Sequence, residues 1–312
     1  MKHILDIASL STDEINEILN LAFKLKEILH RPIPKVPTLR GKLIVNLFYE
    51  PSTRTRFSFE RAAKALSADT LSLSAKGTSI EKGETFLDTV KNLRALGADL
   101  FVIRHPCSGT PHFIAKHIDV PVINAGDGIH AHPTQALLDL ITVKEKLGTL
   151  SGLKIAIIGD IKHSRVAHSD ILAFQKMGSK VSVSGPAQLL PDIKEQKYFE
   201  IIPGGFEVCY EVVSAIKDAD VIIALRIQKE RHGTPIIPSY LEYHQFFGLT
   251  LETLKSAKRN AILMHPGPIN WGIELAPELE KYPFQVILDQ VENGVAIRMA
   301  LLLKLLMGDK EV

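Results

Sequence analysis

The chain has 312 residues, a length that fits two domains better than one. Hydrophobic residues make up 46% of it and charged residues 23%, the balance of a globular protein with a sizeable core, which argues against disorder. The net charge of +2, without a dense run of Lys or Arg, argues against a protein that binds nucleic acid.

Cysteine content and hydropathy indicate the compartment. The two cysteines, Cys107 and Cys209, are too few for a disulfide framework or a zinc site. No stretch approaches 18 consecutive apolar residues, and residues 1–15 turn polar too early for a secretory signal. We therefore expect a cytoplasmic protein that does not span a membrane.

The first half of the chain predicts alternating helices and strands. Ser11 and Glu14 form a capping-box pattern at the start of the first helix. Strands are then expected at 43–49, 70–74, 99–104 and 121–126, and helices at 56–66, 84–97 and 109–117. A long amphipathic helix follows at 132–148, with Pro133 in its first turn.

A second alternating series begins at residue 153. Strands are expected at 153–160, 180–185, 220–226 and 261–267, with a helix ending near Met177 and a last helix at 291–307. Repeated alternation of this kind predicts an α/β protein with doubly wound parallel sheets. We expect two such domains, residues 1–148 and 149–288, joined by the long helix, and a C-terminal helical segment, 289–312, that packs back on the first domain.

The segment Ser52-Thr53-Arg54-Thr55-Arg56 follows the first strand and opens a helix. Backbone N–H groups and the helix dipole favour an anion there, and hydroxyl and guanidinium groups add donors that suit a phosphate. A helix cap is the alternative, but a cap needs one hydroxyl and not three. The sequence therefore predicts phosphate binding, although the P-loop spacing G-x-x-x-x-G-K-[ST] is missing.

Three further clusters carry polar side chains between the predicted elements of the first half. Ser79 and Lys82 lie in a glycine-bounded turn that, taken alone, is more typical of a solvated loop. Arg104 ends a buried strand and fits a ligand site as well as it fits an ordinary loop. His132 and Gln135 share a face at the start of the long helix, where a neutral imidazole can donate to a carbonyl group; simple capping is the alternative. No H-E-x-x-H spacing is present, so we expect no metal there.

The second half repeats the arrangement. Gly159 is the only glycine of a Rossmann-like turn, which argues against a dinucleotide. Arg165 near the next helix suits a carboxylate, Arg226 and Gln228 follow a later strand, and Pro266-Gly267 form part of a rigid turn after the last strand. Each could be an ordinary loop residue, but ligands of open α/β sheets bind beyond the carboxyl ends of the strands. Together these clusters therefore favour a common site.

In this order and spacing the motifs resemble the transcarbamoylase family, and its aspartate branch in particular. They are S-T-R-T-R at 52–56, K-G-E at 82–84, R-H-P at 104–106, H-P-T-Q at 132–135, R-x-Q-K-E-R at 226–231 and H-P-G-P at 265–268. The ornithine branch typically carries H-C-L-P in the last of these. The chain departs from many relatives at Trp271, where they carry Arg.

The resemblance implies transfer of the carbamoyl group of carbamoyl phosphate to the amine of L-aspartate, in pyrimidine biosynthesis, without a metal or organic cofactor. It implies catalytic roles for Arg54, Thr55, Lys82, Arg104 and His132. It also implies substrate contacts from Ser52, Thr53, Ser79, Gln135, Arg165, Arg226, Gln228, Pro266 and Gly267. Residues 52–55 and Arg104 would bind the phosphate. The carbamoyl group would be bound by Thr55, Arg104, His132 and Gln135. The two aspartate carboxylates would be bound by Arg165, Arg226 and Gln228.

The resemblance further implies a homotrimer with shared active sites, because Ser79 and Lys82 would reach the site of a neighbouring subunit. It leaves open a regulatory chain or a pathway partner. Arg56 receives no substrate role, and we expect it to form a structural ion pair. Two rivals remain at this point: a transcarbamoylase for another amine such as ornithine, and an inactive scaffold subunit.

Overall fold

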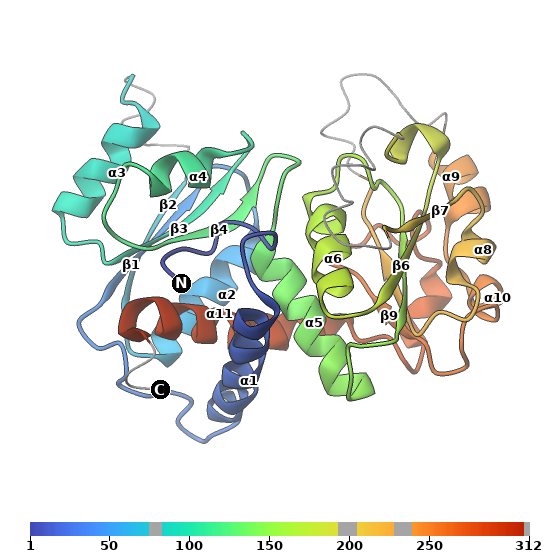
Figure 1. Ribbon diagram of the computed structural model, residues 1–312, viewed down its shortest axis with the longest axis horizontal. Helices are drawn as coiled ribbons and strands as arrows, with labels where there is room; N and C mark the ends of the chain where they lie inside the picture. Colours follow the sequence, from blue (N-terminus) through green and yellow to red (C-terminus); the bar gives the residue numbers. More distant parts are fainter. Residues whose placement is uncertain (75–82, 193–204, 228–238, 309–312) are drawn as a thin grey trace. The chain divides into compact units, whose positions relative to one another are not determined.

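Two parallel β-sheets organise the chain, as Figure 1 shows. The computed structural model describes residues 1–74, 83–192, 205–227 and 239–308. The strands are ordered β2-β1-β3-β4 in the first sheet and β7-β6-β5-β8-β9 in the second, and neighbouring strands pair in parallel. The predicted α/β fold with two doubly wound parallel sheets is thus confirmed. Grouped by contacts, Met1–Ile141 and Val291–Val312 form one unit and Thr142–Gln290 the other.

The first unit surrounds the four-stranded sheet. Its strands are β1 (Leu43–Phe48), β2 (Asp69–Ser74), β3 (Leu100–His105) and β4 (Val122–Asp127). Its helices are α1 (Thr12–Leu29), α2 (Thr53–Ala65), α3 (Phe86–Ala95), α4 (Thr110–Ala115), the first part of α5 (Pro133–Leu147) and most of α11 (Ile287–Met307). Buried aliphatic and aromatic side chains of β1, β3 and β4 form its core, including Val45, Leu47, Phe101, Ile103 and Val122.

Helix α1 begins as its sequence predicts. The Ser11 hydroxyl accepts from the Glu14 N–H at 3.1 Å, and the Glu14 carboxylate accepts from the Ser11 N–H at 2.9 Å. A cap of this kind contributes about 1 kcal/mol. The face of α1 that carries Ile15, Ile18 and Leu19 is buried.

The C-terminal helix α11 packs on helices of the first unit, which confirms the expectation for it. Lys304 of α11 lies 2.5 Å from Glu17 of α1, and Lys26 of α1 lies 3.4 Å from Glu292. The helix begins at Ile287, four residues earlier than its sequence pattern indicated.

The second unit surrounds the five-stranded sheet. Its strands are β5 (Lys154–Ile158), β6 (Lys180–Ser184), β7 (Glu207–Cys209), β8 (Val221–Ala224) and β9 (Ile262–Met264). Its helices are the rest of α5, α6 (Arg165–Lys176), α8 (Val212–Ile216), α9 (Tyr240–Phe247), α10 (Leu251–Leu254) and the 3₁₀ turns Ala187–Leu189 and Pro277–Lys281. The short elements β7, α8, α9 and α10 were not predicted.

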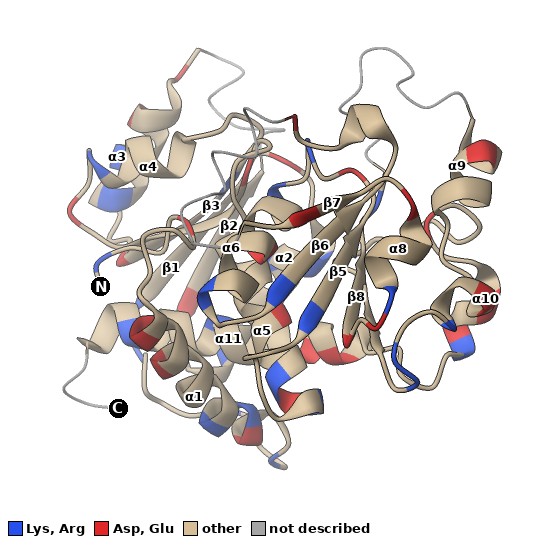
Figure 2. Cartoon of the chain, turned by 45° about the vertical axis from the view of Figure 1, so that its right-hand side comes forward, with Lys and Arg blue, Asp and Glu red and all other residues tan. Residues whose placement is uncertain are grey.

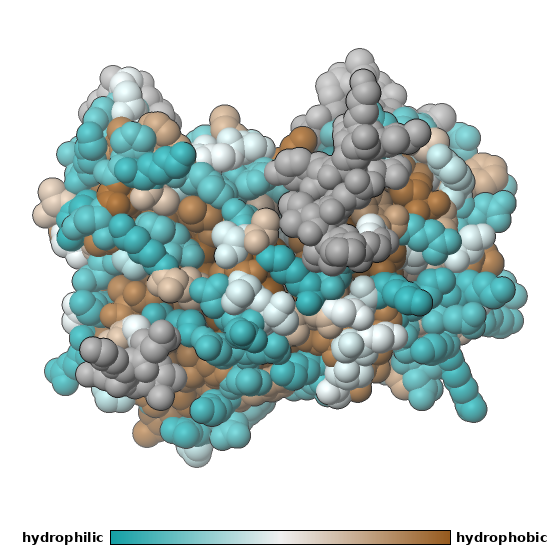
Figure 3. Space-filling model, viewed as in Figure 1, coloured by the Kyte–Doolittle hydropathy of each residue, from teal (hydrophilic) through white to brown (hydrophobic). Residues whose placement is uncertain are grey.

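Charged residues are sparse along the strands and frequent on the helices and loops, as Figure 2 shows. On the face drawn in Figure 3, hydrophilic residues are interspersed with hydrophobic ones. None of the described helices combines the length and the apolar character that a membrane crossing requires.

Each sheet has one point where its strand order reverses. In the first sheet, β1 pairs with β2 on one side and β3 on the other, so the order in which successive strands are added reverses between β1 and β3. In the second sheet, β5 has β6 on one side and β8 on the other. The carboxyl ends of the two central strands at such a reversal form the crevice in which open α/β sheets bind ligands.

Candidate active site

The N-terminus of α2 lies directly after β1, at the reversal point of the first sheet. Ser52 occupies the N-cap position, but its hydroxyl makes no capping hydrogen bond, and the first turn holds no acidic residue. Helix capping, the alternative explanation for this hydroxyl, is therefore not observed for Ser52. Thr55 is buried, whereas Thr53 and Arg54 are exposed. This helix end offers N–H groups, hydroxyl groups and a guanidinium to an anion.

Arg104 enters the same region from the end of β3. The strand register places it opposite Phe48, and the Tyr49 N–H donates to its carbonyl at 2.8 Å. Its side chain is 12% exposed; Nη2 donates to Glu50 Oε1 at 2.7 Å and Nη1 to the Ala125 carbonyl at 3.2 Å. These two acceptors fix the plane of the guanidinium at the carboxyl end of the sheet.

His132 and Gln135 start helix α5, beyond the end of β4. His132 is 4% exposed, and its carbonyl accepts from the Gln135 N–H at 3.0 Å. Its Nδ1 lies 3.5 Å from the Thr134 hydroxyl. The Gln135 amide nitrogen donates to both carboxylate oxygens of Asp139 at 3.1 Å. The three strands β1, β3 and β4 thus deliver Arg54, Arg104 and His132 to one edge of the sheet.

Asp139 is a site residue that the sequence analysis missed. It is fully buried one turn after Gln135. Desolvation lowers the pKa of Arg54, and the charge of Asp139 partly opposes that shift. Burial lowers the pKa of Arg298 to about 9, and Asp139 opposes that shift while Arg54 adds to it. The negative charge of one buried carboxylate therefore stabilises the charged forms of two guanidinium groups. Its i,i+4 spacing from Gln135 was the available signal, whereas nothing in the sequence indicated Arg298.

Arg56 forms the structural ion pair that we expected. Its Nε lies 3.8 Å from Glu60 Oε1, one turn along α2. Its guanidinium also lies over the Phe57 ring, 4.8 Å from the centroid.

The second unit presents its candidate residues at the reversal between β5 and β8. Gly159 directly follows β5 with φ of 137°, and a Cβ there would lie 3.0 Å from Leu225. Only glycine allows this close approach of the two strand ends. Arg165 is the first residue of α6 and is 3% exposed, while Ser164 caps that helix by accepting from the Ala167 N–H at 3.2 Å.

Arg226 follows β8 and is half-buried, and Pro266 and Gly267 follow β9. The turn after β9 is held from within: the Gly267 N–H donates to His265 Nδ1 at 2.8 Å, and the His265 N–H donates to Gln290 Oε1 at 2.9 Å. Trp271, four residues further on, is 38% exposed. The candidate residues of this unit thus follow β5, β8 and β9, three adjacent strands.

Three expected site residues, Ser79, Lys82 and Gln228, lie outside the described residues. Their roles remain predictions. The other expected residues lie at or just beyond strand ends, as predicted, or in the first turn of the helix that follows.

Family models and relatives agree along the whole chain. The model of the aspartate/ornithine carbamoyltransferase carbamoyl-P binding domain matches residues 2–145, and that of the Asp/Orn binding domain matches residues 151–305. The aspartate carbamoyltransferase catalytic subunit of Syntrophobacter fumaroxidans is 54% identical over 309 residues, which cover 99% of this chain and 98% of that protein. The catalytic subunit of Desulforapulum autotrophicum is 55% identical over 300 residues, covering 96% and 94%.

The fold comparison points the same way. Aspartate transcarbamoylase from Trypanosoma cruzi, solved with N-(phosphonacetyl)-L-aspartic acid, superimposes with a TM-score of 0.90 at 28% identity, covering 98% of this chain and 96% of that one. The motifs, the two sheets and the relatives agree: the chain belongs to the aspartate/ornithine carbamoyltransferase family.

Proposed function

We propose that the chain transfers the carbamoyl group of carbamoyl phosphate to L-aspartate, giving N-carbamoyl-L-aspartate and phosphate. The observation that carries this proposal is the placement of cationic and donor residues beyond the carboxyl ends of both sheets. The aspartate acceptor is supported by the names of the similar curated proteins and by the turn His265-Pro266-Gly267-Pro268, which lacks the cysteine typical of the ornithine branch.

The first domain, residues 1–148 with the C-terminal segment 289–312, binds carbamoyl phosphate in this proposal. Ser52, Thr53, Arg54 and Thr55 hold the phosphate at the α2 N-terminus, helped by Arg104. Thr55, Arg104 and His132 donate to the carbamoyl oxygen, and Gln135 contacts the carbamoyl nitrogen. The support is the uncommitted Ser52 hydroxyl, the absence of carboxylates from the first turn of α2, and the fixed plane of Arg104.

The second domain, residues 149–288, binds aspartate. Arg165, Arg226 and Gln228 hold its two carboxylates, and the backbone of Pro266 and Gly267 lines the site. The buried position of Arg165 at the start of α6 supports this role, since a buried guanidinium is a strong partner for a carboxylate.

The chemistry follows from charge. When the amine attacks the carbonyl carbon, negative charge develops on the carbamoyl oxygen, and Arg104, Thr55 and His132 stabilise it as donors fixed in advance. Holding two anionic substrates in line supplies much of the remaining acceleration, and the cations around them offset their repulsion. The departing phosphate accepts the amine proton, so no protein nucleophile is needed.

The assembly in this proposal is a homotrimer in the cytoplasm, acting in pyrimidine biosynthesis. Ser79 and Lys82 complete the site of a neighbouring subunit. The edge strand β2, which leads toward these residues, has exposed or half-buried side chains throughout, as an edge that a partner covers would have. A regulatory chain is compatible with the words "catalytic subunit" in the names of similar proteins.

The test is turnover by the purified protein with carbamoyl phosphate and a panel of amine acceptors: aspartate, ornithine and an acylated ornithine. We expect N-carbamoyl-L-aspartate and phosphate in equal amounts. Turnover with ornithine but not aspartate would overturn the acceptor, and no turnover with any amine would favour an inactive scaffold.

A further inference from the structure

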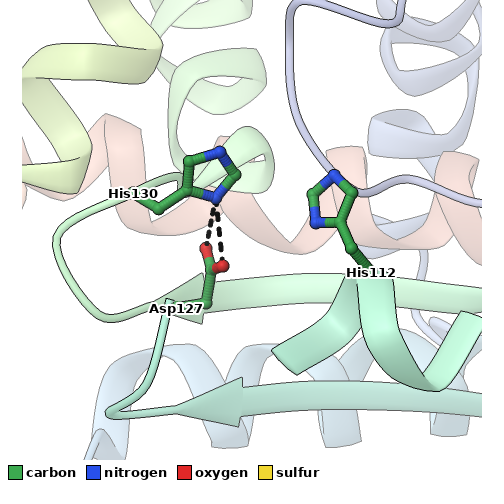
Figure 4. Close-up of side chains that lie close together, drawn as sticks. All are labelled: His112, Asp127 and His130. Carbon is green, nitrogen blue, oxygen red and sulfur yellow. Dashed lines mark hydrogen bonds and ion pairs between the residues drawn. The ribbon is translucent and has the colours of Figure 1, made fainter. Parts of the chain in front are cut away.

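A second cluster of ligand-type side chains lies in the first unit, on segments that bear no assigned substrate contact. It consists of His112 on α4, Asp127 at the end of β4 and His130 in the loop before α5. One ligand atom from each of the three lies within 4.8 Å of the others. The two imidazole rings are 5.4 Å apart between centroids. Figure 4 shows His130 in contact with the Asp127 carboxylate and a ring nitrogen of His112 turned toward them.

The environment of His112 is that of a metal ligand. Its Nε2 lies 2.8 Å from Asp6 Oδ2, so the ring donates a hydrogen bond to that carboxylate. Its Nδ1 is buried and has no hydrogen-bond partner among the described residues. Metal-binding histidines characteristically donate one ring N–H to a carboxylate and present the other nitrogen to the ion. The His112 ring is arranged in this way before any ion is added.

Asp127 provides a buried negative charge beside this nitrogen. It is fully buried, and backbone and amide donors hold its oxygens: the Gly109 N–H at 2.6 Å, the Ala131 N–H at 3.1 Å and the Asn124 amide at 2.8 Å. These neutral groups orient the carboxylate without cancelling its charge. His130 Nδ1 lies 3.0 Å from Oδ2 and contacts the same carboxylate; as a metal ligand this imidazole is neutral, so binding the ion displaces its proton.

The Nδ1 lone pair of His112 is turned toward the Asp127 carboxylate, whose oxygens already accept hydrogen bonds, and this nitrogen has no donor among the described residues. A cation between the two side chains would give the His112 nitrogen the partner that it lacks. We propose that His112, Asp127 and His130 bind a divalent transition-metal ion of the zinc class, with Asp6 positioning His112. Two imidazoles and one carboxylate suit Zn²⁺ better than the oxygen-preferring Mg²⁺. Tetrahedral bonds of about 2.0–2.2 Å require ligand atoms roughly 3.5 Å apart, so binding draws the widest-spaced ligand atoms together by about an ångström.

The sequence analysis expected no metal because the H-E-x-x-H spacing is missing, and a test of local spacing cannot detect this cluster. His112 precedes β4 in the chain, Asp127 is the last residue of β4 and His130 follows it, and only the fold brings α4 beside the β4–α5 loop. A bound ion would tie these segments together immediately before His132. The inference rests on this geometry alone, so it stands or falls separately from carbamoyl transfer.

The experiment is calorimetric titration of the chelator-treated, metal-free protein with Zn²⁺, and separately with Mg²⁺. We expect one Zn²⁺ per chain and no Mg²⁺ binding at this site. His112→Ala and His130→Ala should each abolish the stoichiometric Zn²⁺ site. Asp6→Asn should weaken it about 10- to 100-fold, because it removes the group that orients His112. The matched control is His117→Ala, since His117 lies just beyond α4 and outside the cluster.

A second readout removes ambiguity about folding. Zn²⁺ should raise the unfolding temperature of the wild type and of His117→Ala but not of His112→Ala, and circular dichroism should show all the variants folded. If His112→Ala were to lose its fold, Asp6→Asn with the same titration would still decide. Absence of a stoichiometric site, or Zn²⁺ binding that persists in folded His112→Ala, would overturn the proposal.

Discussion

The Gln135 amide nitrogen lies 3.1 Å from both carboxylate oxygens of Asp139, and both side chains are buried. This places a residue expected to contact substrate one hydrogen bond away from a carboxylate that also balances Arg54 and Arg298. A buried charge of this kind orients its neighbours, and removing it leaves their charges uncompensated.

Asp139→Asn should therefore destabilise the protein, by about 3–5 kcal/mol, because the buried guanidinium of Arg298 loses its counter-charge. It should also lower kcat/KM, since the Gln135 amide loses one of its two acceptors and the remaining one is no longer charged. Urea denaturation and steady-state kinetics measure the two effects. The control is Asp289→Asn, which breaks a half-exposed pair with Lys146 and should cost less than about 1 kcal/mol. Equal, small effects of both variants would contradict the role of Asp139.

Arg54→Ala should lower turnover at least about a hundredfold, roughly 2.7 kcal/mol of transition-state stabilisation, with the fold intact. The reason is that Arg54 is exposed at the α2 N-terminus and does not pack in the core. Arg56→Ala is the matched control on the same helix. It removes an i,i+4 ion pair worth about 0.3–0.5 kcal/mol and should leave turnover within about threefold. Comparable losses in both variants would refute the distinction.

The sequence predicted the long elements well, for an identifiable reason. Strands such as 43–48 and 154–158 are mostly apolar, and ligands of a parallel sheet bind beyond the carboxyl ends of its strands. It did not predict β7, α8, α9 or α10, because none of these short elements is marked by a long apolar run or by a helical period of several turns.

Contacts between distant segments were equally out of reach. Glu50 was passed over although it precedes the Ser52–Arg56 motif, because only the register of β1 and β3 brings it to Arg104. Arg298 reaches Asp139 through the return of α11 to the first unit, which no local pattern encodes. The same reasoning applies to His112 and Asp127.

Glu50→Gln tests whether the pair with Arg104 matters for turnover. The 2.7 Å contact is charge-assisted, so neutralising Glu50 should loosen the guanidinium while keeping one acceptor for it. We expect kcat/KM for carbamoyl phosphate to fall about tenfold, clearly less than in Arg104→Ala. A loss in Glu50→Gln as large as in Arg104→Ala would mean that Glu50 has a role of its own.

A pH prediction concerns the surface pair of Arg94 and Asp119. Two hydrogen bonds, of 2.8 and 2.9 Å, join them, and those to Arg94 lower the pKa of Asp119 from 3.8 to about 2. Since the folded pKa lies below the unfolded one, the stabilisation is present above pH 3.8 and is lost as the pH falls toward 2. Carboxyl-detected NMR titration should show the pKa of Asp119 returning toward 3.8 in Arg94→Gln. An unchanged midpoint would show that Arg94 is not the cause.

The shared active site gives the sharpest test of the assembly. If Lys82 acts in the site of a neighbouring subunit, a Lys82→Ala chain and an Arg54→Ala chain are each inactive in a pure trimer. Mixing them creates interfaces in which one chain supplies Arg54 and its neighbour supplies Lys82. Activity should then return to a fraction set by the mixing ratio, with KM near that of the wild type.

The mixed trimers must be shown to form, for example by native mass spectrometry of chains that differ in a tag. Mixing Arg54→Ala with His132→Ala is the matched control. Both residues lie in the first unit of the same chain, so no interface of that mixture contains a complete set and no activity should return. Recovery with the first mixture alone supports a shared site. Proven exchange without recovery places Lys82 in the site of its own chain, which would remove the main argument for the trimer.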